Sequence, residues 1–163
     1  MPIDFHELDH EFFMREALIE ARLAGEAGER PIGAVIVHQN QIVGRGRARH
    51  QARQSGIAHA EMNALFQAEQ YLYSHPHECV LYTTVEPCVM CLGAIVMSDI
   101  DHVVYSLVDN WIKPSGMLMI DYVRRHIKNY VGGVLAETNS ELWERVLPHE
   151  LIMIREGKLP KIG

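Results

Sequence analysis

Residues 79–98, CVLYTTVEPCVMCLGAIVMS, join an apolar strand directly to a helix. The segment CVLYTTV is apolar and β-branched, which is typical of a strand buried in a sheet. Pro87 follows at a position that suits the first turn of a helix, because that turn has no use for the N–H group that proline lacks. A strand that leads straight into a helix is the building unit of α/β proteins, so this stretch predicts an α/β fold.

The same alternation of strands and helices extends along the rest of the chain. Asp9 is expected to cap a first helix whose apolar residues keep helical spacing as far as Gly25. Further helices are expected from about His59, near 117–126, and at Thr138, which is spaced from Glu141 as in a capping box. Further strands are expected at 32–37, 42–47, 102–107 and 130–136. The first two strands form a hairpin that feeds a mixed sheet with helices on both faces, in one domain covering residues 1–163.

The composition describes an acidic chain with enough apolar residues for one core. Its 163 residues are 48% hydrophobic, and the formal net charge is −6. No apolar run approaches the ~20 residues of a membrane span, and the acidic start does not resemble a signal peptide. We therefore expect a cytoplasmic protein with no membrane partner. The negative charge makes nucleic acid an unlikely partner, since binding phosphates requires a basic surface.

One basic segment departs from this balance. Arg45, Arg47, Arg49 and Arg53 lie within nine positions of the sequence. These arginines can form the solvated edge of a strand and its loop, or they can bind an anionic group. The sequence leaves both interpretations open.

The helix that follows Pro87 carries two cysteines near its start. Cys88 and Cys91 are three positions apart, so their sulfur atoms lie on one face of the helix. A helix N-terminus stabilises thiolates, and two neighbouring thiolates repel each other unless a cation lies between them. Zinc, which binds thiolate sulfur at about 2.3 Å, is the natural occupant.

A third zinc ligand is expected from His59, which also lies at the start of a helix that follows a strand. Residues at such junctions converge at one edge of a sheet. Two cysteines and one histidine leave one coordination position open for water, as in catalytic zinc sites. Glu61, two residues after His59, is then placed to carry protons between the attacking water and the leaving group.

Each part of this site also has a simpler interpretation. Cys88 and Cys91 alone can be a redox pair or half of a structural zinc site, although a thioredoxin-like pattern and a second CxxC pair are missing from the sequence. His59 and Glu61 alone can be a helix-start histidine and a surface charge. Cys79 can be a fourth ligand, but its position at the start of a strand favours a buried thiol. Together, HxE after one strand and PCxxC after the next favour catalysis.

The chain resembles the cytidine-deaminase-like zinc hydrolases over most of its length. The segments RPIGAVIV, HAEMNAL, LYTTVEPCVMCLGAIVMS and HVVYSLVDN occur in the order of that superfamily, which includes cytosine, guanine and tRNA adenosine deaminases. The resemblance implies a three-layer α/β/α fold around a five-stranded mixed sheet. It also implies that His59, Cys88 and Cys91 hold Zn²⁺, that Glu61 transfers protons, and that backbone groups at Ala60 and Cys88 bind the substrate ring and the attacking oxygen.

One position departs from the pattern of the family. Related base deaminases carry a substrate-binding asparagine after the second strand, and the fixed distance to the HxE motif places Ala48 there. Alanine cannot form a hydrogen bond through its side chain. Either His50 or a nearby arginine makes this contact instead, or the substrate presents a different polar edge.

Further candidates for the substrate pocket lie close to the ends of the expected strands. They are Ile32, Pro87, Asp109, Asn110 and Trp111. Trp111 can stack on a heterocycle or pack on its loop, and Asp109 can recognise an amine or hydroxyl group or cap the next turn. The tail, LPHELIMIREGKLPKIG, can cover the pocket or pack on another subunit.

These features predict hydrolytic deamination of a small free aminated heterocycle, such as guanine or cytosine, with release of ammonia. One alternative is deamination of adenosine in tRNA, and another is a non-catalytic binding module that uses zinc for structure. The apolar helix after Pro87 and the family resemblance also predict a homodimer, although that helix can instead be buried fully within one chain.

Overall fold

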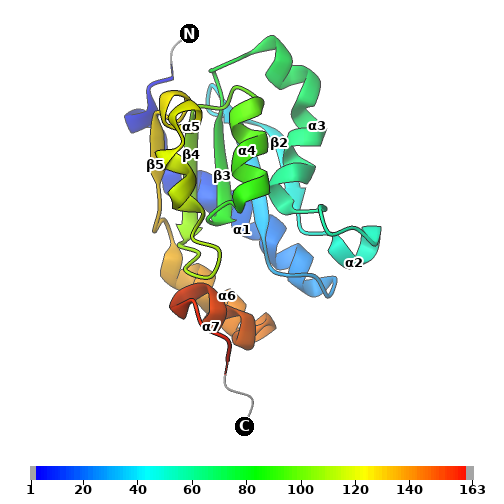
Figure 1. Ribbon diagram of the computed structural model, residues 1–163. Helices are drawn as coiled ribbons and strands as arrows, with labels where there is room; N and C mark the ends of the chain where they lie inside the picture. The colour runs from blue at the N-terminus through cyan, green and yellow to red at the C-terminus, as the bar shows by residue number, and fades with distance from the viewer. Residues whose placement is uncertain (1–2, 161–163) are drawn as a thin grey trace.

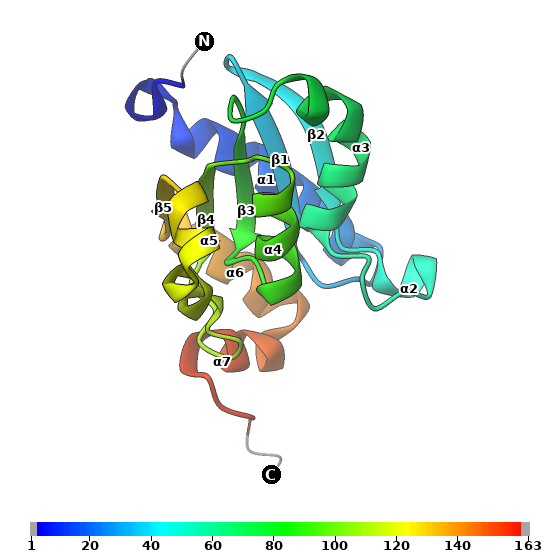
Figure 2. The same cartoon turned by 45° about the horizontal axis from the view of Figure 1, so that its top comes forward.

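A five-stranded sheet lies between two layers of helices in the structure, a computed structural model that describes residues 3–160 (Figures 1 and 2). The strands, in the spatial order β2-β1-β3-β4-β5, are β1 (Gly33–His38), β2 (Gln41–Arg47), β3 (Val80–Val85), β4 (His102–Leu107) and β5 (Asn129–Val131). β1 runs antiparallel to β2 and β3, whereas β3, β4 and β5 are parallel. The predicted α/β/α fold with a mixed sheet is confirmed.

Helices cover both faces of this sheet. Helices α3 (Ala60–Ser74), α4 (Val89–Met97) and α5 (Asp121–His126) lie on one face, and α1 (His10–Glu26) and α6 (Ala136–Val146) lie on the other. The shorter elements are η1 (Phe5–Glu7), α2 (His50–Arg53), η2 (Pro114–Met119) and α7 (Pro148–Glu156). Successive side chains of a strand point to opposite faces of the sheet. Ile36 and Leu81 therefore pack in the core under α3, and Val35 and Tyr82 pack in the core under α1.

The ends of several elements show which sequence signals were reliable. The carboxylate of Asp9 accepts a hydrogen bond from the N–H of Phe12 at 2.9 Å, so the predicted cap of α1 is present. The predicted capping box at Thr138 is wrong, because α6 begins at Ala136 after Leu135 adopts a left-handed conformation. The last strand ends at Val131, well before the predicted residue 136, and helix α2 was not predicted.

A close approach between β2 and α3 fixes the start of α3. Gly46 lies in β2, and a Cβ atom added there would collide with the backbone oxygen of Ala60 and the backbone nitrogen of Ala64. Glycine at this position therefore allows the first turn of α3 to rest directly on the sheet. Within residues 3–160, no helix is both long enough and apolar enough to cross a membrane.

Candidate active site

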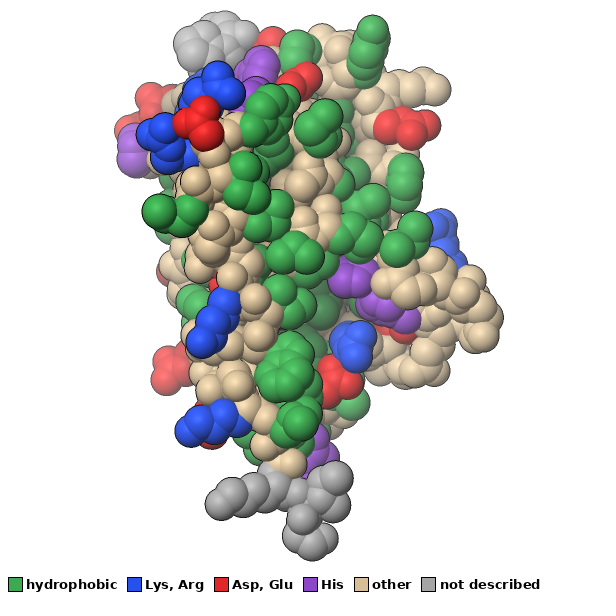
Figure 3. All heavy atoms as spheres, viewed as in Figure 1, with side chains coloured by type: hydrophobic (Ala, Val, Ile, Leu, Met, Phe, Trp, Pro, Cys, Tyr) green, Lys and Arg blue, Asp and Glu red, His purple; other side chains and the backbone are tan. Residues whose placement is uncertain are grey.

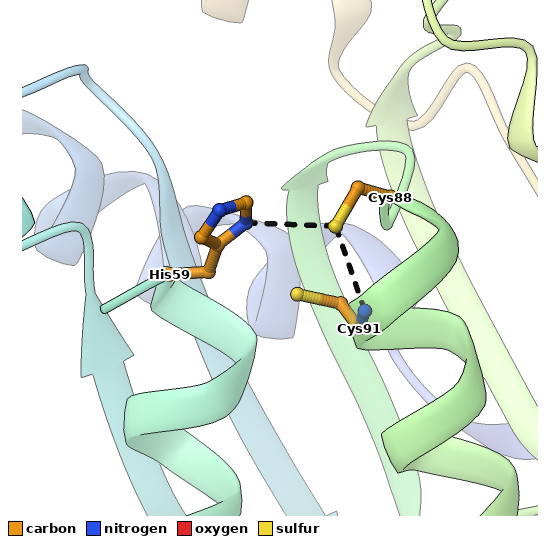
Figure 4. A group of neighbouring side chains, drawn as sticks. All are labelled: His59, Cys88 and Cys91. Carbon is orange, nitrogen blue, oxygen red and sulfur yellow. Dashed lines mark hydrogen bonds between the residues drawn. The ribbon is translucent and has the colours of Figure 1, made fainter. Parts of the chain in front are cut away.

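Three potential zinc ligands meet where α3 and α4 begin. His59 and Cys88 are the N-cap residues of these helices, and Cys91 lies in the first turn of α4 (Figure 4). The Nδ1 atom of His59 is 3.6 Å from the Sγ atom of Cys88, and one ligand atom from each of the three residues lies within 4.8 Å of the others. Atoms that bind one tetrahedral ion at 2.0–2.3 Å are roughly 3.5 Å apart, so this cluster fits zinc.

The electrostatics of the cluster favour a thiolate at Cys88. Its sulfur accepts a hydrogen bond from the N–H of Cys91 at 3.5 Å. Hydrogen bonding with Cys91, and to a smaller extent with His59, lowers the pKa of Cys88 to about 4. The bond to Cys88 also raises the pKa of His59, and the proximity of Cys88 and burial raise the pKa of Cys91. The surroundings thus favour a thiolate at Cys88, and a cation bound beside it would neutralise this charge.

Glu61 lies beside this cluster and is almost completely buried. One carboxylate oxygen accepts a hydrogen bond from the hydroxyl group of Thr83 at 2.9 Å, and the other lies 3.5 Å from the sulfur of Cys91. Burial raises the pKa of Glu61. The side chain is therefore held in one orientation next to the potential ligands, in surroundings that favour proton uptake.

Cys79, the third cysteine, is remote from this chemistry. It is completely buried just before β3, and burial raises its pKa to about 12. Among the described residues, the potential metal cluster consists of His59, Cys88 and Cys91. Cys79 is thus a core thiol, as the sequence favoured.

A cavity of about 260 Å³ opens next to the cluster. Most of the predicted site residues line it: Ile32, His50, His59, Ala60, Glu61, Cys88, Asp109 and Trp111. Cys91, Pro87 and Asn110 are not among the lining residues. Pro87 is buried between the lining residues Glu86 and Cys88, and the side-chain amide of Asn110 donates to the carbonyl of Arg155 at 2.7 Å. Asn110 therefore attaches its loop to the C-terminal helix.

The walls of the cavity include residues that no sequence motif indicates. Trp143 of α6 is completely buried, and Glu86 is nearly so; both line the cavity. The sequence left two roles open for the tail, covering the pocket or packing on another subunit, and Met153 and Ile154 of α7 contribute to the lining of the cavity. Only the apolar residues of the tail signalled this contact in the sequence.

The cavity wall that includes Ala48 also includes buried polar atoms that have no hydrogen-bond partner in the described chain. Ala48 lines the cavity, and so does His50, whose ring centre lies 4.8 Å from that of His59. Both ring nitrogens of His50 are buried and have no hydrogen-bond partner among residues 3–160. By contrast, a carboxylate oxygen of Asp109 already accepts bonds from the N–H groups of Trp111 and Ile112, each at 2.9 Å, as expected for a capped turn.

The fold and the potential metal cluster define a zinc-dependent deaminase of the cytidine deaminase type. Residues 8–107 match the family model of the cytidine and deoxycytidylate deaminase zinc-binding region, and the chain belongs to this family. The tRNA-specific adenosine deaminase of Bacillus subtilis (strain 168) is 41% identical over 131 residues, which are 78% of this chain and 81% of the relative.

Solved structures are also similar to this chain, and two of them come from studies of deaminases. One comes from a study of A-to-I editing by tRNA:A34 deaminases and is 32% identical, with a TM-score of 0.67; the match covers 77% of this chain and 100% of that chain. The other, guanine deaminase from Bacillus subtilis, is 37% identical, with a TM-score of 0.56; the match covers 61% of this chain and 64% of that chain.

These relatives correct two expectations from the sequence. The prediction of a small free heterocycle as substrate is wrong, because the curated relatives that match at 41% identity are named tRNA-specific adenosine deaminases. The prediction that nucleic acid is an unlikely partner is wrong for the same reason. It relied on the net charge of the whole chain, which does not describe the charge beside the cavity.

Proposed function

We propose that the protein deaminates adenosine in tRNA by hydrolysis, which consumes water, converts this nucleoside to inosine and releases ammonia. The observation that carries this proposal is the cluster of His59, Cys88 and Cys91 beside the buried carboxyl group of Glu61, in a chain 41% identical to a tRNA-specific adenosine deaminase over most of both lengths. An adenine inside a duplex or a stacked loop cannot reach such a site, so the base must leave its stack and enter the cavity.

In this proposal the three clustered side chains bind zinc and Glu61 transfers protons. When bound, zinc lowers the pKa of a water molecule to about 7 and so supplies a nucleophile near neutral pH. The carboxylate of Glu61 takes a proton from the attacking water and delivers it to the departing amino group. Its bond from Thr83 holds one oxygen, which leaves the oxygen near Cys91 to exchange the proton.

The remaining proposed contacts hold the base. Ile32 and Trp111 supply apolar walls, and the backbone of Ala60 and Cys88 supplies polar groups near the reacting carbon. His50 makes the polar contact that Ala48 cannot make, because its two buried ring nitrogens are unpaired within the described chain. Asp109 and Asn110 lie in one loop, and their polar groups form part of the rim of the cavity. Pro87 fixes the turn that places Cys88 beside the cavity.

We also propose a homodimer in the cytoplasm. Figure 3 shows hydrophobic side chains gathered over α4 and the elements beside it. Val89 and Met97 of α4 are 55% and 72% exposed, whereas Leu92 and Ile95 on the same helix are fully buried, so the chain itself covers only one side of α4. Sedimentation at micromolar concentration tests the dimer; a monomer at that concentration contradicts it.

The proposed location in the cytoplasm is supported by the cysteines. All three are free of disulfide bonds, which suits a reducing compartment.

The test of the proposed function compares RNA with free bases. Zinc-loaded protein is incubated with unmodified tRNA whose anticodon begins with adenosine, and inosine is measured by mass spectrometry after digestion to nucleosides. We expect inosine from this tRNA and none from a tRNA in which guanosine replaces that adenosine. Ammonia from free adenine, adenosine or guanine, without inosine in tRNA, overturns the proposal.

A further inference from the structure

A second hollow, distinct from the catalytic cavity, is lined by the arginine-rich segment. It has a volume of about 550 Å³. Its four basic side chains are those of Arg45 and Arg47 in β2, Arg49 at the N-cap of α2, and Arg53 in α2. The other lining residues are Glu20, Gly46, Asn63, Phe66 and Gln67. Four guanidinium groups around one hollow is a high density of positive charge for a chain whose net charge is −6.

Two carboxylates only partly neutralise these arginines. Arg45 forms an ion pair with Glu16 at 2.5 Å and lies 3.8 Å from Glu20. The Nε atom of Arg47 is 3.9 Å from a carboxylate oxygen of Glu20, which is close to the limit for an ion pair. The hollow therefore holds more positive charge than the two carboxylates balance.

The arginine at the N-cap of α2 and the one inside this helix carry the excess charge. In the part of the chain that the structure describes, neither Arg49 nor Arg53 forms an ion pair with a carboxylate. Arg53 donates a hydrogen bond to the side-chain oxygen of Asn63 at 3.1 Å, which leaves its charge unbalanced. An anion that enters the hollow would meet these two guanidinium groups without displacing a carboxylate.

Helix α2 connects the hollow to the catalytic cavity. Arg49 lines the hollow, and the next residue, His50, lines the cavity. The buried carboxylate of Glu29 accepts hydrogen bonds from the N–H groups of Gln51 and Ala52 at 3.1 and 2.8 Å, and this fixes α2 against the rest of the protein. A polynucleotide with one base in the cavity would therefore have its neighbouring backbone beside these arginines.

The chemistry of the hollow suits single-stranded RNA. Guanidinium groups bind phosphate oxygens through paired N–H groups. The aromatic ring of Phe66 on α3 is 57% exposed at the same hollow, where a nucleotide base can stack on it. A combination of unpaired arginines and an exposed aromatic ring is characteristic of sites that follow an unpaired strand.

We infer that this hollow binds the phosphodiester backbone of the RNA loop next to the base that enters the catalytic cavity. The inference rests on the proposed function and adds to it a location for substrate binding outside the cavity. Arg49 and Arg53 provide the phosphate contacts, and Phe66 provides a stacking surface for a neighbouring base.

The test removes the two unpaired charges and compares the result with an equal change elsewhere. The test variant is Arg49→Ala with Arg53→Ala. The control is Arg15→Ala with Arg22→Ala on α1, where each arginine is exposed and forms an ion pair with a glutamate four residues away. Binding of a fluorescent anticodon-loop RNA hairpin is measured by anisotropy at several salt concentrations between 50 and 200 mM.

Loss of two phosphate contacts has a defined signature. Each contact to a single strand contributes about 0.7 to the slope of log affinity against log salt concentration, so the test variant should lose about 1.4 from this slope. The control should keep the slope of the original protein. A third variant, Arg49→Lys with Arg53→Lys, keeps the charges and should recover most of the slope.

The possible outcomes separate this inference from the proposed function. If the test variant keeps the original slope, or if the control loses as much, the hollow is not the site of phosphate binding and the inference is overturned. If the original protein forms inosine in tRNA in that case, the proposed function survives. If the original protein neither binds the hairpin nor forms inosine, both fail.

Discussion

Replacement of Glu61 by glutamine should abolish turnover while zinc remains bound. Glu61 is 3% exposed, and its carboxylate accepts a hydrogen bond from the hydroxyl group of Thr83. Glutamine has nearly the same shape, and its side-chain oxygen can accept the same bond from Thr83. Its amide group can donate to the sulfur of Cys91, which lies 3.5 Å from the carboxylate oxygen that it replaces. The variant therefore keeps the local contacts and loses only the ability to transfer protons.

The size of the effect follows from that single loss. General acid–base catalysis by one side chain contributes about 10²–10⁴ to the rate, which corresponds to roughly 3–5 kcal/mol of transition-state stabilisation. We expect kcat for inosine formation to fall by at least 100-fold. Zinc content, measured by atomic emission on the purified variant, should stay near that of the original protein.

Glu86 offers a matched control for this prediction. Glu86 is also a buried glutamate that lines the cavity, but its oxygens accept bonds from the N–H of Asp109 and the hydroxyl of Tyr130, each at 3.0 Å. We expect Glu86→Gln to lower kcat by less than 10-fold. If Glu61→Gln keeps kcat within 10-fold of the original, Glu61 is not the proton carrier. If it loses zinc while Glu86→Gln does not, Glu61 helps to hold the metal, and the assignment is refuted.

Three further predictions concern stability. Removal of zinc should lower the melting temperature by roughly 10 °C, because zinc at 1,000 times its Kd stabilises the folded state by about 4 kcal/mol; a chelator titration followed by calorimetry checks this. Gly46→Ala should lower the free energy of unfolding, measured in urea, by about 1–3 kcal/mol or more. Gly116→Ala should change it little, because a Cβ atom there would meet open space. Burial alone would raise the pKa of Asp101, but hydrogen bonds from Lys128 and His77 lower it overall, so the carboxylate stabilises the fold above its ordinary pKa of about 3.9. Asp101→Asn should cost about 1–2 kcal/mol at pH 7, and this difference should vanish as the pH falls through the lowered pKa of the folded state.

The parts of the fold and site that the sequence predicts are those determined by neighbouring residues. Cys88 and Cys91 lie at the start of one helix, and His59 and Glu61 lie at the start of another. These four residues and the strands before them are therefore enough to predict the cluster. The alternation of apolar strands and helices likewise predicts the layers. Each of these signals lies within about ten residues of the feature that it predicts.

The parts that the sequence does not predict depend on contacts between remote segments. Asn110 directly follows β4, which is a position typical of pocket residues. Its side-chain amide instead donates a hydrogen bond to the carbonyl of Arg155, which is 45 residues away in the sequence. Helix α2 has a single turn, and the bonds that hold its N–H groups come from Glu29. A four-residue helix has too little local signal to be recognised, because its stability comes from that distant carboxylate.

The mistaken expectation that nucleic acid is an unlikely partner has a physical cause in the range of electrostatic forces. At physiological ionic strength the Debye length is about 8 Å, so a phosphate near α2 interacts mainly with charges close to it. The net charge of −6 counts acidic groups across the whole surface, most of which are screened from that phosphate. Arg49 and Arg53, without carboxylate partners in the described chain, add positive charge there that no neighbouring carboxylate balances. An acidic protein can therefore bind RNA where a few arginines remain unbalanced, and the salt dependence of binding measures how many of them take part.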